Sequence, residues 1–138
     1  MSECKLITPS LTYKGKQGLT YWEGISTETV GSKGICMHSL WIPPGARAVA
    51  HRHRNHETAI YMIRGAVDTW WGDNLENFIQ ARADQYLYIP ANVPHLPWNR
   101  SEDEALCIIS RTDPHEQESV EVLPELDAAF MRRMKVPV

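Results

Sequence analysis

The sequence predicts an all-β protein, a sandwich or barrel of short strands that is followed by a short helix. Short apolar or alternating runs recur along most of the chain, and Pro, Gly, Asn and Asp residues separate them. Short strands at such close spacing, with turn residues between them, are typical of β-sandwiches and β-barrels. The expected strands are residues 19–22 at an edge, then 35–42, 48–53, 58–63, 67–71, 78–81, 86–89, 95–99 and 105–111.

The helix is expected near the end of the chain, within residues 123–134. Pro124 would stand at its first position, acidic residues fall in its first turn and arginines in its last, which suits the helix dipole. Leu126, Phe130 and Met134 are spaced four residues apart. That spacing predicts that these three side chains form the buried stripe.

Length and charge limit the kind of protein. A chain of 138 residues fits one domain, here residues 1–138, that can build a core without disulfides. The net charge of -3 offers no basic surface for nucleic acid. No apolar stretch is long enough to cross a membrane, and the first residues lack the apolar core of a signal peptide. We therefore expect a cytoplasmic protein with neither a nucleic-acid nor a membrane partner.

The densest chemical signal is a group of histidines. His51, His53 and His56 stand within six residues, Glu57 follows at once, and His95 comes later. Alternate residues of a strand point to the same face, so His51 and His53 can bind one ion together. Neutral imidazole suits zinc, copper, iron and nickel. The segment therefore predicts a metal site.

The spacing of these residues resembles a motif of the cupin superfamily. Gly45, then His51, His53 and Glu57, then Gly65 match the first conserved motif of that family.

A second segment resembles the other cupin motif. Asp84, then Pro90 to His95, then Asn99 follow the pattern PxGxxHxxxN, with Asn92 where the family has glycine. Asparagine accepts a positive φ more readily than other non-glycine residues, so Asn92 is expected at φ > 0.

The resemblance implies a fold and a cofactor. It implies a cupin-type double-stranded β-helix, or jelly-roll barrel, over about residues 35–111, with a C-terminal strap and helix in 112–138. In that barrel His95 would cross the interior to join His51 and His53 as ligands of one divalent ion, which could be Fe, Mn, Ni or Zn. Small cupins commonly pair, so the resemblance also implies a homodimer.

The fourth ligand is ambiguous in the sequence. Counted forward from His53, Glu57 stands at the family's metal-binding glutamate; counted back from Gly65, Thr58 takes that place. A shift of one residue reverses the face of a strand, so the second count turns Glu57 outward and His56 and Thr58 inward. Glu57 is the expected fourth ligand, with His56 or water as alternatives. Whichever of His56 and Glu57 is not a ligand is the candidate general base.

Arginines and tryptophans surround the site in the sequence. Arg47 and Arg111 are candidates for binding an anionic substrate. Strand alternation directs Arg52 and Arg54 away from the metal. The tryptophans at 70, 71 and 98 could line a pocket, fill the core or form an interface.

The predicted function is a small metal-dependent cupin enzyme that acts on an oxygen-rich small molecule as a dioxygenase, decarboxylase or isomerase. The alternative is a metal-dependent small-molecule binder or sensor without catalysis. The fold alone cannot decide between them, because it supports many chemistries.

Overall fold

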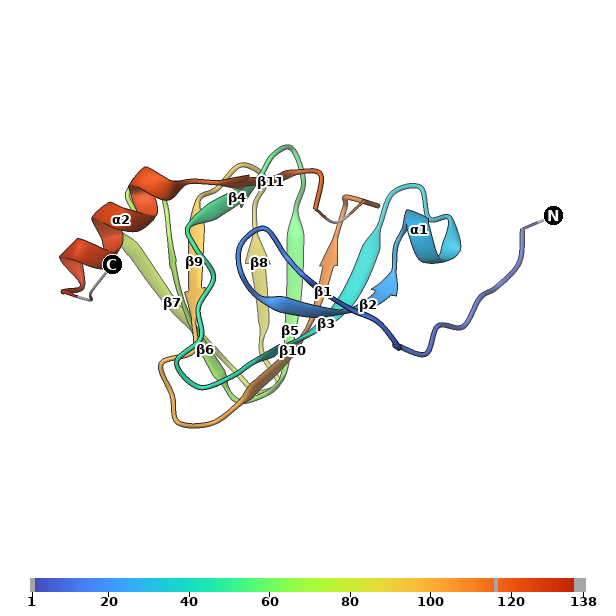
Figure 1. The fold of residues 1–138 in the computed structure, drawn as a ribbon, viewed down its shortest axis with the longest axis horizontal. Coiled ribbons are helices and arrows are strands. Elements are labelled where there is room, and N and C mark those ends of the chain that lie inside the picture. Colours follow the sequence, from blue (N-terminus) through green and yellow to red (C-terminus); the bar gives the residue numbers. More distant parts are fainter. Residues whose placement is uncertain (1, 116, 136–138) are drawn as a thin grey trace.

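Two antiparallel β-sheets face each other in the computed structural model of the chain, which describes residues 2–115 and 117–135 (Figure 1). The six-stranded sheet has the order β1 (Thr12–Lys14), β2 (Thr20–Ile25), β3 (Cys36–Ile42), β10 (Ala105–Arg111), β5 (Thr58–Arg64) and β8 (Tyr86–Ile89). The five-stranded sheet has the order β11 (Val120–Val122), β4 (His51–His53), β9 (His95–Trp98), β6 (Ala66–Trp71) and β7 (Asn77–Arg82). This is a jelly-roll β-sandwich, as the sequence predicts.

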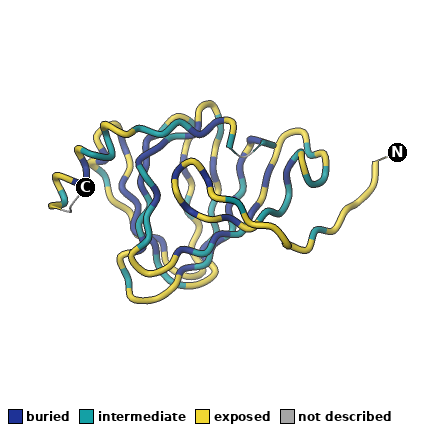
Figure 2. The backbone as a smooth tube through the Cα atoms, in the orientation of Figure 1, coloured by how far each residue is buried: buried dark blue, intermediate teal, exposed yellow. Residues whose placement is uncertain are grey.

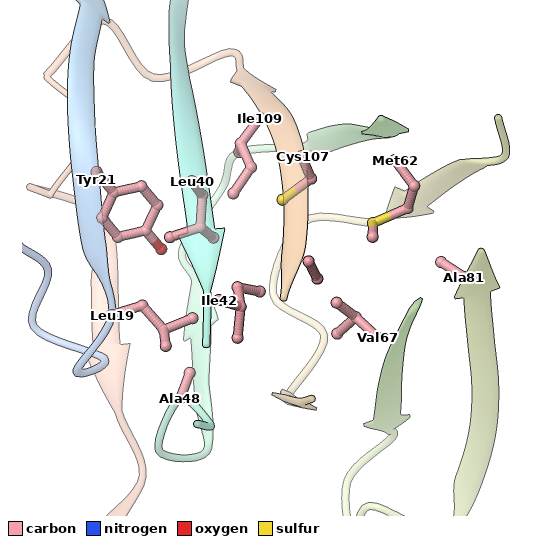
Figure 3. Close-up of a cluster of buried hydrophobic side chains, with 11 residues drawn as sticks. Leu19, Tyr21, Leu40, Ile42, Ala48, Met62, Val67, Ala81, Cys107 and Ile109 are labelled. Atoms are coloured by element: carbon pink, nitrogen blue, oxygen red, sulfur yellow. The ribbon is translucent and has the colours of Figure 1, made fainter. Parts of the chain in front are cut away.

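Strict alternation along the central strands creates the core. In β3 and β10 every second residue is buried, and those side chains point between the two sheets. Figure 3 shows Leu40, Cys107, Ile109 and Met62 meeting in this space, with Tyr21 beside them. Each fully buried aliphatic side chain of this kind contributes about 1.5–3 kcal/mol to folding. Figure 2 shows the same contrast along the backbone, with buried residues in the two sheets and exposed ones in the N-terminal segment.

A second apolar cluster lies on the outer face of the five-stranded sheet. Helix α2 (Pro124–Arg133) packs Phe130 and Met131 against Trp70 and Leu96. All three residues of the expected stripe pack in this cluster: Phe130 is fully buried, and Leu126 and Met134 are half-buried at its edge. Met131, which was not expected, is buried as well. Trp70 and the half-buried Trp98 therefore belong to the packing of α2.

Asp127 joins this helix to the segment that leads into β4. Its carboxylate accepts two hydrogen bonds from the Arg47 guanidinium, at 2.7 and 3.1 Å, and a third from the Ala50 backbone N–H at 2.8 Å. Arg47, one of the two candidates for binding an anionic substrate, therefore has its guanidinium paired with α2.

Three elements were not expected from the sequence. These are the edge strand β1, the short strand β11 and the single-turn helix α1 (Thr27–Val30). As a result β2 lies between β1 and β3 rather than at an edge. In residues 2–115 and 117–135, no helix combines the length and the apolar character needed to span a membrane.

Candidate metal centre

Three histidines meet inside the barrel. His51 and His53 lie on the inner face of β4, and His95 on β9 is paired directly with His51 in the sheet register. One nitrogen of each ring lies within 4.8 Å of the others, and each residue is at most 3% exposed. The structure thus brings together three of the four residues expected to bind metal.

Backbone carbonyls fix the tautomers of two of these rings. His51 Nδ1 lies 2.7 Å from the Val49 carbonyl oxygen, and His95 Nδ1 lies 2.9 Å from that of Val93. A carbonyl oxygen can only accept, so each Nδ1 carries the proton and donates it. Each Nε2 then keeps a lone pair, which is the arrangement that metal-binding histidines commonly have.

The third ring, that of His53, has a nitrogen whose hydrogen-bonding capacity is not satisfied by the described residues. His53 Nε2 is buried and has no hydrogen-bond partner among the described residues. An unsatisfied buried nitrogen costs stability unless a ligand or ion occupies its lone pair. The residues therefore fit a metal ion, since coordination would satisfy this atom.

Burial keeps all three imidazoles neutral. It lowers the pKa of His95 to about 4, and it lowers the pKa of His51 well below the usual value. The pKa of His53 is also lowered, first by burial and then by the positive charge of Arg111. Neutral imidazole is the form that binds metal, so the site is ready to coordinate at neutral pH.

A buried arginine lies beside the histidines. Arg111, at the end of β10, is 4% exposed, and its Nε donates a hydrogen bond to Thr58 Oγ1 at 3.2 Å. Arg111, Thr58, His51 and His95 all line a small cavity of about 40 Å³ between the two sheets, called the interior cavity below. None of the described residues that line it is acidic. The centre thus combines a buried guanidinium with neutral imidazoles that can bind a metal ion.

Glu57 and His56 lie outside this group. Glu57 is exposed, and its Oε1 accepts a 2.6 Å hydrogen bond from the Tyr88 hydroxyl. His56 is half-buried, with Nδ1 3.3 Å from Thr112 Oγ1. Thr58, at 1% exposed, points inward. Glu57 thus points outward and Thr58 inward, which is the arrangement expected when the strand register is counted back from Gly65.

The remaining arginines near β4 face outward, as expected. Arg52 makes two 3.1 Å hydrogen bonds to the carboxylate of Glu121 on β11, and Arg54 lies 3.7 Å from the same carboxylate. These contacts hold β11 against β4 and take no part in the cavity.

Sequence reasoning missed Gln17 and Thr69, which also line the interior cavity. Gln17 lies between β1 and β2, strands whose pairing no local pattern indicated. Thr69 could have been found by parity, because in β6 it shares a face with the buried Val67.

The comparisons with known proteins agree with the fold. The family profile described as "Cupin domain" matches residues 40–110. No curated protein sequence matches the chain.

Solved structures support the fold at low identity. A mutant form of Bacillus subtilis oxalate decarboxylase OxdC superposes with a TM-score of 0.71 and 17% identity, over 99% of this chain and 39% of that one. The Lactobacillus farciminis oxalate decarboxylase formate complex gives 0.69 and 14%, over 92% and 39%. The polyketide cyclase RemF of Streptomyces resistomycificus gives 0.66 and 16%, over 89% and 85%. This chain thus spans well under half the length of the two decarboxylases, and these likenesses concern the fold alone. From the profile match over residues 40–110, together with the jelly-roll sandwich, we conclude that the chain belongs to the cupin family.

Proposed function

We propose that this protein is a mononuclear metal-dependent enzyme that acts on a small, oxygen-rich acid. His51, His53 and His95 would hold one divalent ion, and Arg111 would bind the anionic group of the substrate. One observation carries the proposal: His51, His95 and the buried Arg111 guanidinium line the interior cavity, and ring nitrogens of His51, His53 and His95 lie within 4.8 Å of one another.

The charge of the centre favours an anionic, chelating substrate. Three neutral imidazoles leave the full charge of a divalent ion uncompensated, and Arg111 adds a further positive charge close enough to lower the pKa of His53. A carboxylate with a neighbouring hydroxyl or keto oxygen would offer both negative charge and two donor atoms. When bound, the ion would polarise such oxygens as a Lewis acid or, if it is iron(II), allow reaction with dioxygen.

The chain's own residues would bind and orient the substrate. Arg111 is held by its bond to Thr58, which limits its rotation and fixes where a carboxylate can dock. The apolar side chains around the cavity exclude water, which strengthens charge interactions inside it. The proposal gives His56 and Glu57 no step as general base, because Glu57 is exposed and His56 borders Thr112.

A metal-dependent binder without catalysis is the second candidate. Two observations favour it: the interior cavity is only about 40 Å³, and none of its described lining residues is a carboxylate that could move a proton. A sensor or carrier for a chelating acid would need only the metal and Arg111.

Turnover measurements separate the two candidates. Metal-loaded protein would be incubated with a panel of hydroxy- and keto-acids, while oxygen uptake and product formation are followed. We expect turnover of at least one acid, lost in Arg111→Gln although that variant keeps its metal. Tight binding of an acid without turnover by any tested metal form would favour the binder. A protein that binds neither metal nor acid would contradict both candidates.

A further inference from the structure

A second hollow lies next to the interior cavity, where the edge strands of the two sheets meet. It has a volume of about 220 Å³ and is almost entirely apolar. We call it the edge pocket. Its lining residues come from β6, β7, β8 and the turn after β8: Thr69, Trp71, Ile79, Leu87, Tyr88, Ile89, Pro90 and Val93.

The edge pocket shares part of its wall with the interior cavity. Thr69, Leu87 and Ile89 line both spaces. The interior cavity, at about 40 Å³, has room for the metal-binding end of a ligand but not for a larger body. Any ligand with more than a few atoms beyond its chelating group must therefore extend elsewhere, and the edge pocket adjoins the cavity at these three residues.

The edge pocket also touches the surroundings of His95. Trp71 is paired with His95 in the register of β6 and β9, so their side chains share the inner face of that sheet. Val93 lines the pocket, and its carbonyl oxygen accepts the hydrogen bond from His95 Nδ1. A group in the edge pocket would thus lie beside a metal ligand.

An unsatisfied hydroxyl marks the junction of the two spaces. Thr69 is 2% exposed, and its Oγ1 has no hydrogen-bond partner among the described residues. In the sheet register Thr69 is flanked by Ile79 on β7 and Pro97 on β9, and neither side chain can hydrogen-bond to it. A buried hydroxyl left unpaired costs stability, so a polar atom of a ligand is the partner that would satisfy it.

We propose that the edge pocket binds the ring of a monoaryl hydroxy- or keto-acid whose carboxylate end reaches the metal centre. This inference rests on the proposed function. A cavity of about 150 Å³ lined by apolar side chains can bind benzene, so about 220 Å³ accommodates one substituted six-membered ring. Thr69 would hydrogen-bond an oxygen between the ring and the carboxylate, and Trp71 and Tyr88 would contact the ring.

A matched pair of ligands tests the ring site. Mandelate and glycolate share the same chelating hydroxy-acid end, and only mandelate has a phenyl ring. Calorimetric titration of the zinc-loaded full chain should show mandelate binding at least about tenfold more tightly than glycolate. Equal affinities would overturn the proposal.

Ile79→Glu places a carboxylate in the edge pocket without touching the interior cavity, which Ile79 does not line. It should abolish the preference for mandelate and leave glycolate binding unchanged. Ile63→Glu is the control, because Ile63 is exposed to a similar extent, 44% against 42%, but lies on β5 outside the pocket. A loss of preference in both variants, or in neither, would contradict the assignment.

Thr69→Val tests whether the Thr69 hydroxyl binds ligand, because it separates an effect on ligand affinity from an effect on protein stability. The substitution removes an unpaired buried hydroxyl at constant shape, so the unfolding midpoint should stay the same or rise while mandelate affinity falls about tenfold. Thr69→Ser should keep most of the affinity. Unchanged mandelate affinity in Thr69→Val would remove Thr69 from the site.

The same titrations separate this inference from the proposed function. If glycolate binds only when zinc is present but the ring adds nothing, the metal site stands and the edge-pocket proposal fails. If neither acid binds zinc-loaded protein, both fail.

Discussion

The Tyr88 hydroxyl donates a 2.6 Å hydrogen bond to the carboxylate of Glu57, and it does so at the protein surface. This bond also raises the pKa of Tyr88 above its usual value. Glu57 is exposed just before β5, and only His51, His53 and His95 bring their ring nitrogens together. We therefore infer that these three histidines alone are the protein ligands.

This inference predicts the effect of substituting the two candidate fourth ligands. Glu57→Gln and His56→Gln should each change zinc affinity by less than about twofold in titrations at fixed pH. A ligand carboxylate would make Glu57→Gln markedly weaker, because a charged donor becomes a neutral amide. Tyr88→Phe is the control, since it removes the partner of Glu57 without altering the carboxylate itself.

The anchor of α2 predicts a stability effect. Asp127 accepts three hydrogen bonds from Arg47 and Ala50, so Asp127→Ala should lower the free energy of unfolding by about 1–3 kcal/mol. Urea denaturation would measure the change. Glu125→Ala, at an exposed position of the same helix, should have a much smaller effect. Equal effects would mean that helix propensity, rather than the anchor, decides the loss.

The depressed histidine pKa values predict the pH dependence of the metal-free protein. The unfolded chain takes up protons on its histidines below about pH 6.5, whereas burial lowers the pKa of His95 in the folded state to about 4. Between these values the unfolded state binds more protons, so stability falls as the pH falls.

Urea unfolding with a chelator present would measure this loss between about pH 6.5 and 4, the window between the two pKa values of His95. The slope should be shallower in His95→Gln, which removes one of the groups that must stay neutral. A stability that rises on acidification over this range would contradict the assignment of buried, neutral imidazoles.

The outer face of the six-stranded sheet predicts self-association. Trp22 and Met37 are exposed there, on β2 and β3, whereas α2 covers the outer face of the other sheet. We propose that a second copy of the chain covers this face and forms a homodimer.

Light scattering of the full chain should give the mass of a dimer, and Met37→Lys combined with Trp22→Lys should give a monomer. Phe78→Lys, at an exposed position of the other sheet, is the control and should remain a dimer. A wild-type monomer at every concentration would contradict the proposal.

Much of the fold was predictable because alternation and turn residues are local signals. Residues 86–89 and 105–111 are strands with the expected bounds, and Asn92 has the expected positive φ, at 67°. The strand expected over 48–53 is shorter, His51–His53, because the Val49 N–H is hydrogen-bonded to the Gln17 carbonyl rather than to a neighbouring strand of its sheet. That contact joins distant parts of the chain and leaves no local trace.

Only those site residues that share one strand or one sequence motif could be predicted. His51 and His53 share a strand, and the motif around His95 indicated the third imidazole. The position of Arg111 depends on the pairing of β10 with β5, which sets Arg111 opposite Thr58. No local pattern indicates such a pairing, so the sequence offered Arg111 only as one of two candidates, beside Arg47. The facing of Glu57 likewise depended on a register that the two motif counts left ambiguous.

The metal content of the purified protein tests the central claim most directly. Protein prepared without added metal would be compared by elemental analysis with the His51→Ala and His53→Ala double variant, after circular dichroism has shown that both are folded. We expect about one divalent ion per wild-type chain and little or none in the double variant. A folded double variant that keeps one ion per chain would contradict the assignment of the site to these histidines.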